Sequence, residues 1–243
     1  MVIGVYDSGL GGVDILNKML RKYPNHTYIY VADNKYCPYG IKSNEELRSR
    51  IDKVMKFFEY QHVDFVVVAC NTVSALIINE KDKYLFKIYT ILGANIELIK
   101  QHNIKELCII GTSRLIRSEV FNQELDCDIQ YLNGSLLVKY IEENNAEKII
   151  DEINVLMKFV HNDNKAILLA CTHFPLYKDI FINKKSQKLI LDGSKKLIYS
   201  LPITNNSNIQ SINIFLSKND RSYEEIIKNI LKDYNILIHN INI

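Results

Sequence analysis

The sequence predicts an α/β protein of two similar doubly wound parallel-sheet domains, which face one another across a cleft and are related by a pseudo-twofold axis. One observation behind this prediction is that short apolar runs alternate with helical patterns along the whole chain. Another is that residues 65–72, FVVVACNT, return as residues 166–173, AILLACTH, so that Cys70 and Cys171 stand 171 − 70 = 101 residues apart. Because right-handed crossovers join parallel strands, each half is expected to form its own sheet.

The first half begins with an apolar run at residues 2–6 that breaks into a glycine-rich turn, DSGLGG, at residues 7–12. Apolar residues then recur at helical spacing until Pro24, which predicts strand, turn and helix in that order. Ser43 and Glu46 have the spacing of a capping box and predict the start of the next helix. The strands expected in this half are residues 2–6, 27–32, 63–69 and 87–91.

The second half repeats the order of the first. A strand at residues 107–110 breaks into the turn Gly111-Thr112-Ser113, and a helix is expected from there to about Glu124. The remaining elements expected here are a strand near residues 129–132, two helices, the strand that ends at Cys171, a helix begun by Pro175 and a strand at residues 189–191.

The C-terminal tail has the pattern of a strand, a helix and a strand. Apolar residues at 211–216 and 236–238 flank a helical stretch that begins with a capping-box pattern at residues 222–225. The tail is expected to complete the first sheet. The predicted domains are therefore residues 1–93 together with about 205–243, and residues 94–204.

Composition argues against several classes of protein. The chain has 243 residues and a formal net charge of +2, which gives no indication of a nucleic-acid or membrane partner. It has no apolar stretch of the roughly 20 residues that span a membrane, and no signal-peptide pattern, so a cytoplasmic protein is expected. Its five cysteines form no Cys-x-x-Cys pair and no cluster with zinc spacing, which favours free thiols and no metal.

Polar residues follow the predicted strands where a parallel sheet binds its ligands. Asp7 and Cys70 end strands of the first half, and Cys171 ends one of the second, so both thiols are expected at one cleft. A cysteine at the end of an apolar strand is more often a core residue. Core packing, however, does not ask for Asn, Thr and His directly after it, and Asp7 and His173 are candidate bases for Cys70 and Cys171.

Two thiols on opposite walls of one cleft suit a racemase, in which one thiolate removes an α-proton and the opposite thiol returns one. A thiol hydrolase needs only one cysteine, and disulfide exchange prefers a Cys-x-x-Cys turn. The glycine turn at residues 7–12 lacks the lysine of a phosphate loop and the third glycine of a dinucleotide fingerprint. It therefore suits a carboxylate ligand, or serves only as a tight turn.

Five motifs in this order resemble the glutamate racemases of the aspartate/glutamate racemase superfamily: residues 3–12, 38–40, 68–72, 111–112 and 171–176. The resemblance implies a cofactor-independent enzyme that interconverts L- and D-glutamate and supplies D-glutamate for peptidoglycan. It implies that Cys70 and Cys171 are the acid/base pair, that Asp7 assists the first thiol and that His173 assists the second.

The resemblance also implies a set of residues around the substrate. The positions expected to hold it, in addition to His173, are Ser8, Pro38, Tyr39, Gly40, Asn71, Thr72, Thr112 and Thr172, with Glu142 supporting the second thiol. A homodimer would fit the family. The alternatives are a racemase of the same fold that acts on aspartate and a noncatalytic relative that binds a small anion.

Overall fold

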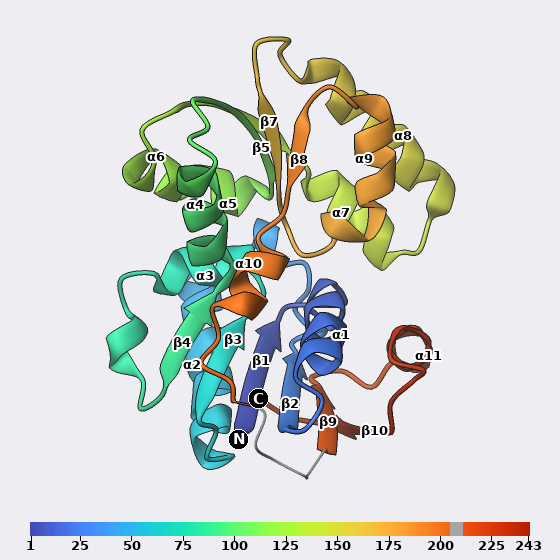
Figure 1. Ribbon diagram of the computed structural model, residues 1–243. Helices are drawn as coiled ribbons and strands as arrows, with labels where there is room; N and C mark the ends of the chain where they lie inside the picture. Colours follow the sequence, from blue (N-terminus) through green and yellow to red (C-terminus); the bar gives the residue numbers. More distant parts are fainter. Residues whose placement is uncertain (205–210) are drawn as a thin grey trace.

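The computed structural model describes residues 1–204 and 211–243 and contains two sheets (Figure 1). The larger sheet has the strand order β10-β9-β2-β1-β3-β4 and the smaller one β6-β5-β7-β8. Every pair of neighbouring strands in both sheets is parallel. The predicted pair of parallel-sheet α/β units is therefore confirmed.

The strands coincide closely with the apolar runs. The larger sheet consists of β1 Val2–Asp7, β2 Thr27–Ala32, β3 Phe65–Val68, β4 Lys87–Thr90, β9 Ser211–Leu216 and β10 Ile236–Asn240. The smaller sheet consists of β5 Glu106–Gly111, β6 Asp128–Asn133, β7 Ala166–Ala170 and β8 Leu189–Leu191. All residues of β3 and β7 are buried, which explains why these strands read as continuous apolar runs. The tail adds β9 beside β2, as expected.

Helices cover both faces of each sheet. Their bounds are α1 Gly11–Lys22, α2 Asn44–Tyr60, α3 Asn71–Ile77, α4 Ile91–Gln101, α5 Ser113–Arg117, α6 Val120–Glu124, α7 Ser135–Glu142, α8 Ala146–Phe159, α9 Lys178–Lys184, α10 Ser194–Tyr199 and α11 Arg221–Ile230. Single 3₁₀ turns occur at Tyr39–Ile41, Lys81–Lys83 and Phe174–Tyr177. Within the described part of the chain, no helix combines the length and the apolar character needed to cross a membrane.

Each sheet has an apolar core on either face. In the larger sheet, α1 and α11 pack on one face around Leu16, while α2 and α3 pack on the other around Phe58. In the smaller sheet, α7, α8 and α9 cover one face around Phe181, and α4, α5 and α6 cover the other around Phe121. Truncating a fully buried phenylalanine such as Phe58 to alanine typically costs about 3–5 kcal/mol of folding free energy.

The two sheets lie one above the other in Figure 1, with α3, α4 and α10 between them. The larger sheet draws its strands from residues 2–90 and 211–240, and the smaller sheet from residues 106–191. The domain boundary expected at about residue 205 lies outside the described residues. The carboxyl ends of β1 and β3 point toward the smaller sheet, so that their following residues face the second unit (Figure 1).

Three helices differ from the prediction. The helix expected to begin at Pro175 is a 3₁₀ turn at Phe174–Tyr177, and α9 begins at Lys178. The helix expected from residue 113 to about Glu124 is split into α5 and α6 at Glu119, whose φ of 53° is left-handed. The helix α11 starts one residue before the capping box expected at residues 222–225, because Asp220 is its N-cap and accepts from the Tyr223 N–H. Ser43 caps α2 as predicted, with its Oγ accepting from the Glu46 N–H at 3.1 Å, whereas the Glu46 carboxylate, expected to reach back to Ser43, pairs with Lys42 at 3.1 Å.

Candidate active site

The candidate residues meet because each follows the carboxyl end of a parallel strand. Asp7 ends β1, Cys70 lies just beyond the neighbouring β3, and Cys171 directly follows β7. Thr112 directly follows β5, which pairs with β7. The two halves of the chain therefore present their strand ends to one another.

Both thiols border one small closed cavity, of about 20 Å³, between the two units. Eleven of the predicted site residues line it: Ser8, Pro38, Tyr39, Gly40, Cys70, Asn71, Thr72, Thr112, Cys171, Thr172 and His173. Val138 and Ala170 complete the lining. Asp7 and Glu142 lie behind the lining, where they bond to residues of the wall. A cavity of this size has room for roughly one water molecule.

The second thiol belongs to a chain of hydrogen bonds. Cys171 Sγ lies 3.5 Å from His173 Nδ1, and His173 Nε2 lies 2.5 Å from Glu142 Oε1. The Leu10 N–H donates to the same carboxylate oxygen at 3.2 Å. Burial by itself lowers the pKa of His173, but Cys171 and Glu142 outweigh burial and raise this pKa well above its ordinary value. Burial raises the pKa of Glu142, yet the bonds from His173 and Leu10 bring it below its usual range.

The first thiol has different surroundings. Cys70 is the N-cap residue of α3, and its Sγ lies 3.7 Å from Ser8 Oγ. Burial, followed by the negative charge of Asp7, raises the pKa of Cys70 to about 12. The Val73 N–H in the first turn of α3 and the Ser8 hydroxyl lower it, but they do not offset burial. Cys70 is therefore a neutral thiol in this closed form.

Asp7 links the two units. Its carboxylate accepts from the Gly9 N–H at 2.8 Å and from the Thr172 hydroxyl, of the other unit, at 3.2 Å. Burial raises the pKa of Asp7 to about 6, although the His173 charge and these two bonds lower it. Asp7 acts on Cys70 through its charge.

The glycine turn is occupied by the protein's own carboxylates. Gly9 donates its N–H to Asp7, and Leu10 donates to Glu142, so these two groups are not free for a ligand carboxylate. Gly11 allows a close approach, because a Cβ there would lie 2.3 Å from Thr172 Oγ1 and 2.7 Å from the Thr172 carbonyl carbon. The turn thus brings the second unit against the first.

The Pro38-Tyr39-Gly40 segment is anchored from beneath. The Tyr39 hydroxyl donates to Asp33 and lies 2.8 Å from the Tyr6 hydroxyl. Asp33 also accepts two bonds from Arg50, at 2.9 and 2.7 Å, and the guanidinium is buried with it. A Cβ on Gly40 would lie 2.6 Å from Thr112 Cβ, so glycine permits the segment to touch the second unit.

Two further bonds connect candidate residues. Thr72 and Thr112, which come from the two different units, join their hydroxyls at 3.1 Å. The Asn71 side-chain oxygen accepts from Asn95 of α4 at 3.0 Å. These bonds fix the orientation of polar groups at the cavity wall.

Sequence reasoning missed Val138 and Cys37. Val138 lies one helical turn before Glu142 on α7, so the helical spacing of four residues was the available signal. Cys37 is adjacent in sequence to Pro38. Its sulfur, Glu142 and His173 place three possible metal-ligand atoms within 4.8 Å of one another. The bond between Glu142 and His173 already accounts for two of these three groups, so the expectation of no metal stays a prediction.

The chain is similar to known proteins over nearly its whole length. No protein-family model matches the chain. A glutamate racemase of Clostridium perfringens (strain SM101 / Type A) is 30% identical over 252 residues, which cover 95% of this chain and 96% of that protein. A glutamate racemase of Aquifex aeolicus is 28% identical over 239 residues, covering 95% of this chain and 94% of the relative.

Solved structures share the fold. Glutamate racemase isoform RacE1 from Bacillus anthracis superposes with a TM-score of 0.89 at 21% identity, covering 99% of this chain and 97% of that one. Glutamate racemase from Francisella tularensis, solved in complex with D-glutamate, gives 0.83 at 22% identity, with 98% and 96% covered. An aspartate racemase from Picrophilus torridus gives 0.65 at 18% identity, with 81% and 90% covered. On its 30% identity to a relative matched over nearly its whole length, the chain belongs to the glutamate racemase family, as its motifs predicted.

Proposed function

We propose that this protein interconverts L- and D-glutamate without a cofactor, by proton transfer at Cα between Cys70 and Cys171, and that it supplies D-glutamate for peptidoglycan. The observation that carries the proposal is that the two thiols come from different units and border the same cavity. Family membership supports the substrate, because the relatives that match over nearly the full chain are glutamate racemases.

The chemistry needs one proton-transfer group on each face of the substrate. In the proposed step a cysteine thiolate removes the Cα proton and becomes a thiol. The electron pair of the broken C–H bond passes into the α-carboxyl group, which becomes an enediolate. The opposite thiol then gives its proton to Cα, the pair returns to form the new C–H bond, and that sulfur becomes the thiolate. Hydroxyl and amide groups of the wall, such as Thr72 and Asn71, are candidates to stabilise the enediolate.

The two thiols have different neighbours in this proposal. Because its pKa is raised well above its ordinary value, His173 keeps its proton near neutral pH and can donate to a thiolate at Cys171. Cys70, whose pKa is about 12, holds its proton as the opposing acid.

Catalysis also requires the two units to move apart, because a cavity of about 20 Å³ cannot admit an amino acid. The contacts that would break include the bonds of Thr172 to Asp7 and of Thr112 to Thr72, and those between the 39–44 segment and α5. Ser113 Oγ donates to the Gly40 carbonyl at 2.9 Å, and Arg114 bonds to the Lys42 carbonyl and to Asn44. Closing the site around the substrate would exclude water from the enediolate.

The test is exchange of the α-proton in D₂O, with L-glutamate and L-aspartate supplied separately. Exchange and racemisation of glutamate are expected, with a loss of roughly 10²–10⁴-fold or more in Cys70→Ala and in Cys171→Ala. Cys127→Ala is the matched control, since Cys127 lies outside the cavity and should retain full activity.

No exchange with glutamate would overturn the proposal, and exchange with aspartate alone would assign the other substrate. Full turnover in both cavity variants would instead favour a noncatalytic relative whose measured activity came from another source. A covalent adduct on a single cysteine would favour a thiol hydrolase.

A further inference from the structure

The carboxylate of Glu142 belongs to the second unit but packs against the first. Glu142 ends α7, and its Oε1 accepts from the Leu10 N–H of the first unit at 3.2 Å. The same oxygen lies 2.5 Å from His173 Nε2, within its own unit. The group that assists the second thiol is therefore held by a carboxylate whose own position depends on the opposite unit.

Two more polar side chains of the first unit lie around this carboxylate. A Cβ built on Gly9 would lie 2.4 Å from Glu142 Oε1 and 2.9 Å from Cys37 Sγ. The same Cβ would lie 3.0 Å from the Tyr223 hydroxyl, so glycine at this position leaves room for the three groups to meet. Cys37 follows β2 and Tyr223 lies in the first turn of α11, so distant parts of the first unit converge here.

Cys37 is suited to donate to Glu142. Burial raises the pKa of Cys37 well above its ordinary value, and the negative charges of Glu142 and Asp7 raise it further, so the thiol keeps its proton. Its sulfur lies within 4.8 Å of both the Glu142 oxygen and the His173 nitrogen. Burial raises the pKa of Glu142, but its hydrogen bonds, one of them from the Cys37 thiol, bring this pKa below its usual range.

The Tyr223 hydroxyl is a second donor beside the carboxylate. Burial raises the pKa of Tyr223 well above its ordinary value, and the negative charge of Glu142 raises it further, so this hydroxyl also keeps its proton. Tyr223 is buried, yet its hydroxyl has no hydrogen-bond partner among residues 1–204 and 211–243. Because a buried donor without an acceptor is unfavourable, the adjacent carboxylate is the group to which it can turn.

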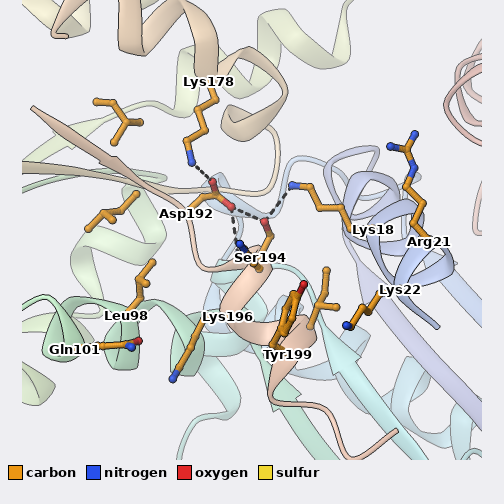
Figure 2. A pocket seen from close by; sticks show the side chains of 14 residues that line it. Lys18, Arg21, Lys22, Leu98, Gln101, Lys178, Asp192, Ser194, Lys196 and Tyr199 are labelled. Atoms are coloured by element: carbon orange, nitrogen blue, oxygen red, sulfur yellow. Dashed lines mark hydrogen bonds and ion pairs between the residues drawn. The ribbon is translucent and has the colours of Figure 1, made fainter. Parts of the chain in front are cut away.

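The turn that carries Leu10 is also fixed against the second unit, through the far end of α1. Lys18 of α1 donates to Ser194 of α10 at 3.0 Å, and Lys178 of α9 pairs with Asp192 at 2.5 Å. Figure 2 shows Lys18 and Lys178 reaching the Asp192–Ser194 pair from opposite sides. Contacts outside the cavity that the two thiols border thus set the position of α1 in the closed form.

We propose, on the basis of the proposed function, that Cys37 and Tyr223 are positioning residues for Glu142. With the Leu10 N–H, they form a socket in the first unit that receives the carboxylate when the two units close. When the units part to admit glutamate, the carboxylate leaves the socket. When they close, the socket fixes Glu142, which holds His173 beside Cys171. The second thiol therefore has a fixed assisting group only while the substrate is enclosed.

A titration of Glu142 in the full-length protein tests the socket without reference to activity. The pKa of Glu142 is read from the carbon-13 signal of its side-chain carboxyl, which is assigned by its loss in Glu142→Gln. Cys37→Ala and Tyr223→Phe each remove a donor and should raise this pKa. Cys37→Ser replaces the thiol by a hydroxyl and should restore the wild-type value or lower it. The titratable groups that face Glu142 are His173, Cys37, Tyr223, Asp7 and Tyr30.

Racemisation of glutamate gives the second readout. Cys37→Ala should lower kcat/KM by roughly 2- to 12-fold, the contribution of one hydrogen bond. The acid limb of the pH profile should move to higher pH, because Glu142 has to be ionised to hold protonated His173. Cys37→Ser should recover both the rate and the profile. The matched control is Cys127→Ala, which removes a thiol outside the cavity and should change neither.

The outcomes separate the socket from the proposed function. An unchanged Glu142 pKa in Cys37→Ala, with the fold intact by circular dichroism, would overturn the proposal. An unchanged pKa in Tyr223→Phe would remove Tyr223 from the socket. A raised Glu142 pKa in both variants, together with no exchange of the glutamate α-proton by the wild type, would support the socket and refute the proposed function.

Discussion

Replacing Glu142 by glutamine tests the hydrogen-bond chain behind the second thiol. The substitution keeps the shape of the side chain but removes the negative charge that lies 2.5 Å from His173 Nε2. A hydrogen bond to a charged group contributes about 1.5–3 kcal/mol, so the loss in kcat/KM should be roughly 10- to 150-fold. The bond from the Leu10 N–H can persist with the amide oxygen, which limits the structural change.

The same substitution should also shift the pH dependence of kcat/KM in a definite direction. Glu142 raises the pKa of His173, so His173 in the glutamine variant releases its proton at a lower pH than in the wild type. If protonated His173 assists Cys171, the alkaline limb of kcat/KM should move to lower pH. Steady-state racemisation, followed by circular dichroism at a series of pH values, measures both effects.

The neighbouring Glu143→Gln is the control, because Glu143 is exposed and pairs only weakly with Lys139, at 3.8 Å. It should leave both the rate and the profile unchanged. An unchanged profile and an unchanged kcat/KM in Glu142→Gln, with the fold intact, would refute the assignment of Glu142 and His173 to the second thiol.

Three further predictions concern Asp7, Gly11 and Tyr39. The pKa of Asp7 is raised from its ordinary value to about 6, so the folded state binds the proton more tightly and loses stability as pH rises from about 4 to about 6. Asp7→Asn should remove this pH dependence, which amounts to about 3 kcal/mol of unfolding free energy for a pKa raised by roughly two. Urea unfolding of both proteins at pH 4 and at pH 7 measures it. An equal pH response in the two proteins would contradict the raised pKa of Asp7. Gly11→Ala should fold but lose roughly 100-fold or more in kcat, because the added Cβ would meet Thr172 and hold the two units apart. The control Gly93→Ala should stay active, because its Cβ would meet only Thr90 Oγ1, at 3.1 Å. Tyr39→Phe removes the hydrogen bonds to Asp33 and Tyr6 and should lower the free energy of unfolding by about 1–3 kcal/mol, with a higher KM. Thermal or urea unfolding measures the loss. Unchanged stability would show that the buried ion pair of Asp33 and Arg50 holds this segment without the Tyr39 hydroxyl.

The parts of the fold that sequence patterns predicted are those set by local physics. The runs ending near Cys70 and Cys171 were recognisable because strands covered on both faces are apolar at every position. Ser43 caps α2 as predicted because an N-cap and its third following residue are close in sequence. The break at Glu119 had no such signal, since glutamate is not a residue that favours left-handed backbone. At α11, Asp220 competes with Ser222 for the same first turn, and the pattern alone could not rank them.

The residues of the candidate site that follow strand ends were predictable from the sequence, whereas the groups behind them and the cavity volume were not. Parallel strands carry Asp7, Cys70 and Cys171 to one edge by topology, so their meeting follows from the fold. Glu142 reaches His173 from α7, and only the family resemblance pointed to it. The small volume of the closed cavity depends on packing between the two units, and this packing leaves no periodic pattern in the sequence.

The central claim is that Cys70 and Cys171 work from opposite faces of Cα, and the earliest turnovers in D₂O test it most directly. Starting from either enantiomer of glutamate, two opposed acid/base groups predict that the product carries deuterium at Cα while the unreacted substrate still carries protium. The same result is expected in both directions, since each thiol protonates one face. Protium retained in the product, or deuterium entering the recovered substrate as fast as the product, would indicate a single group and contradict the account.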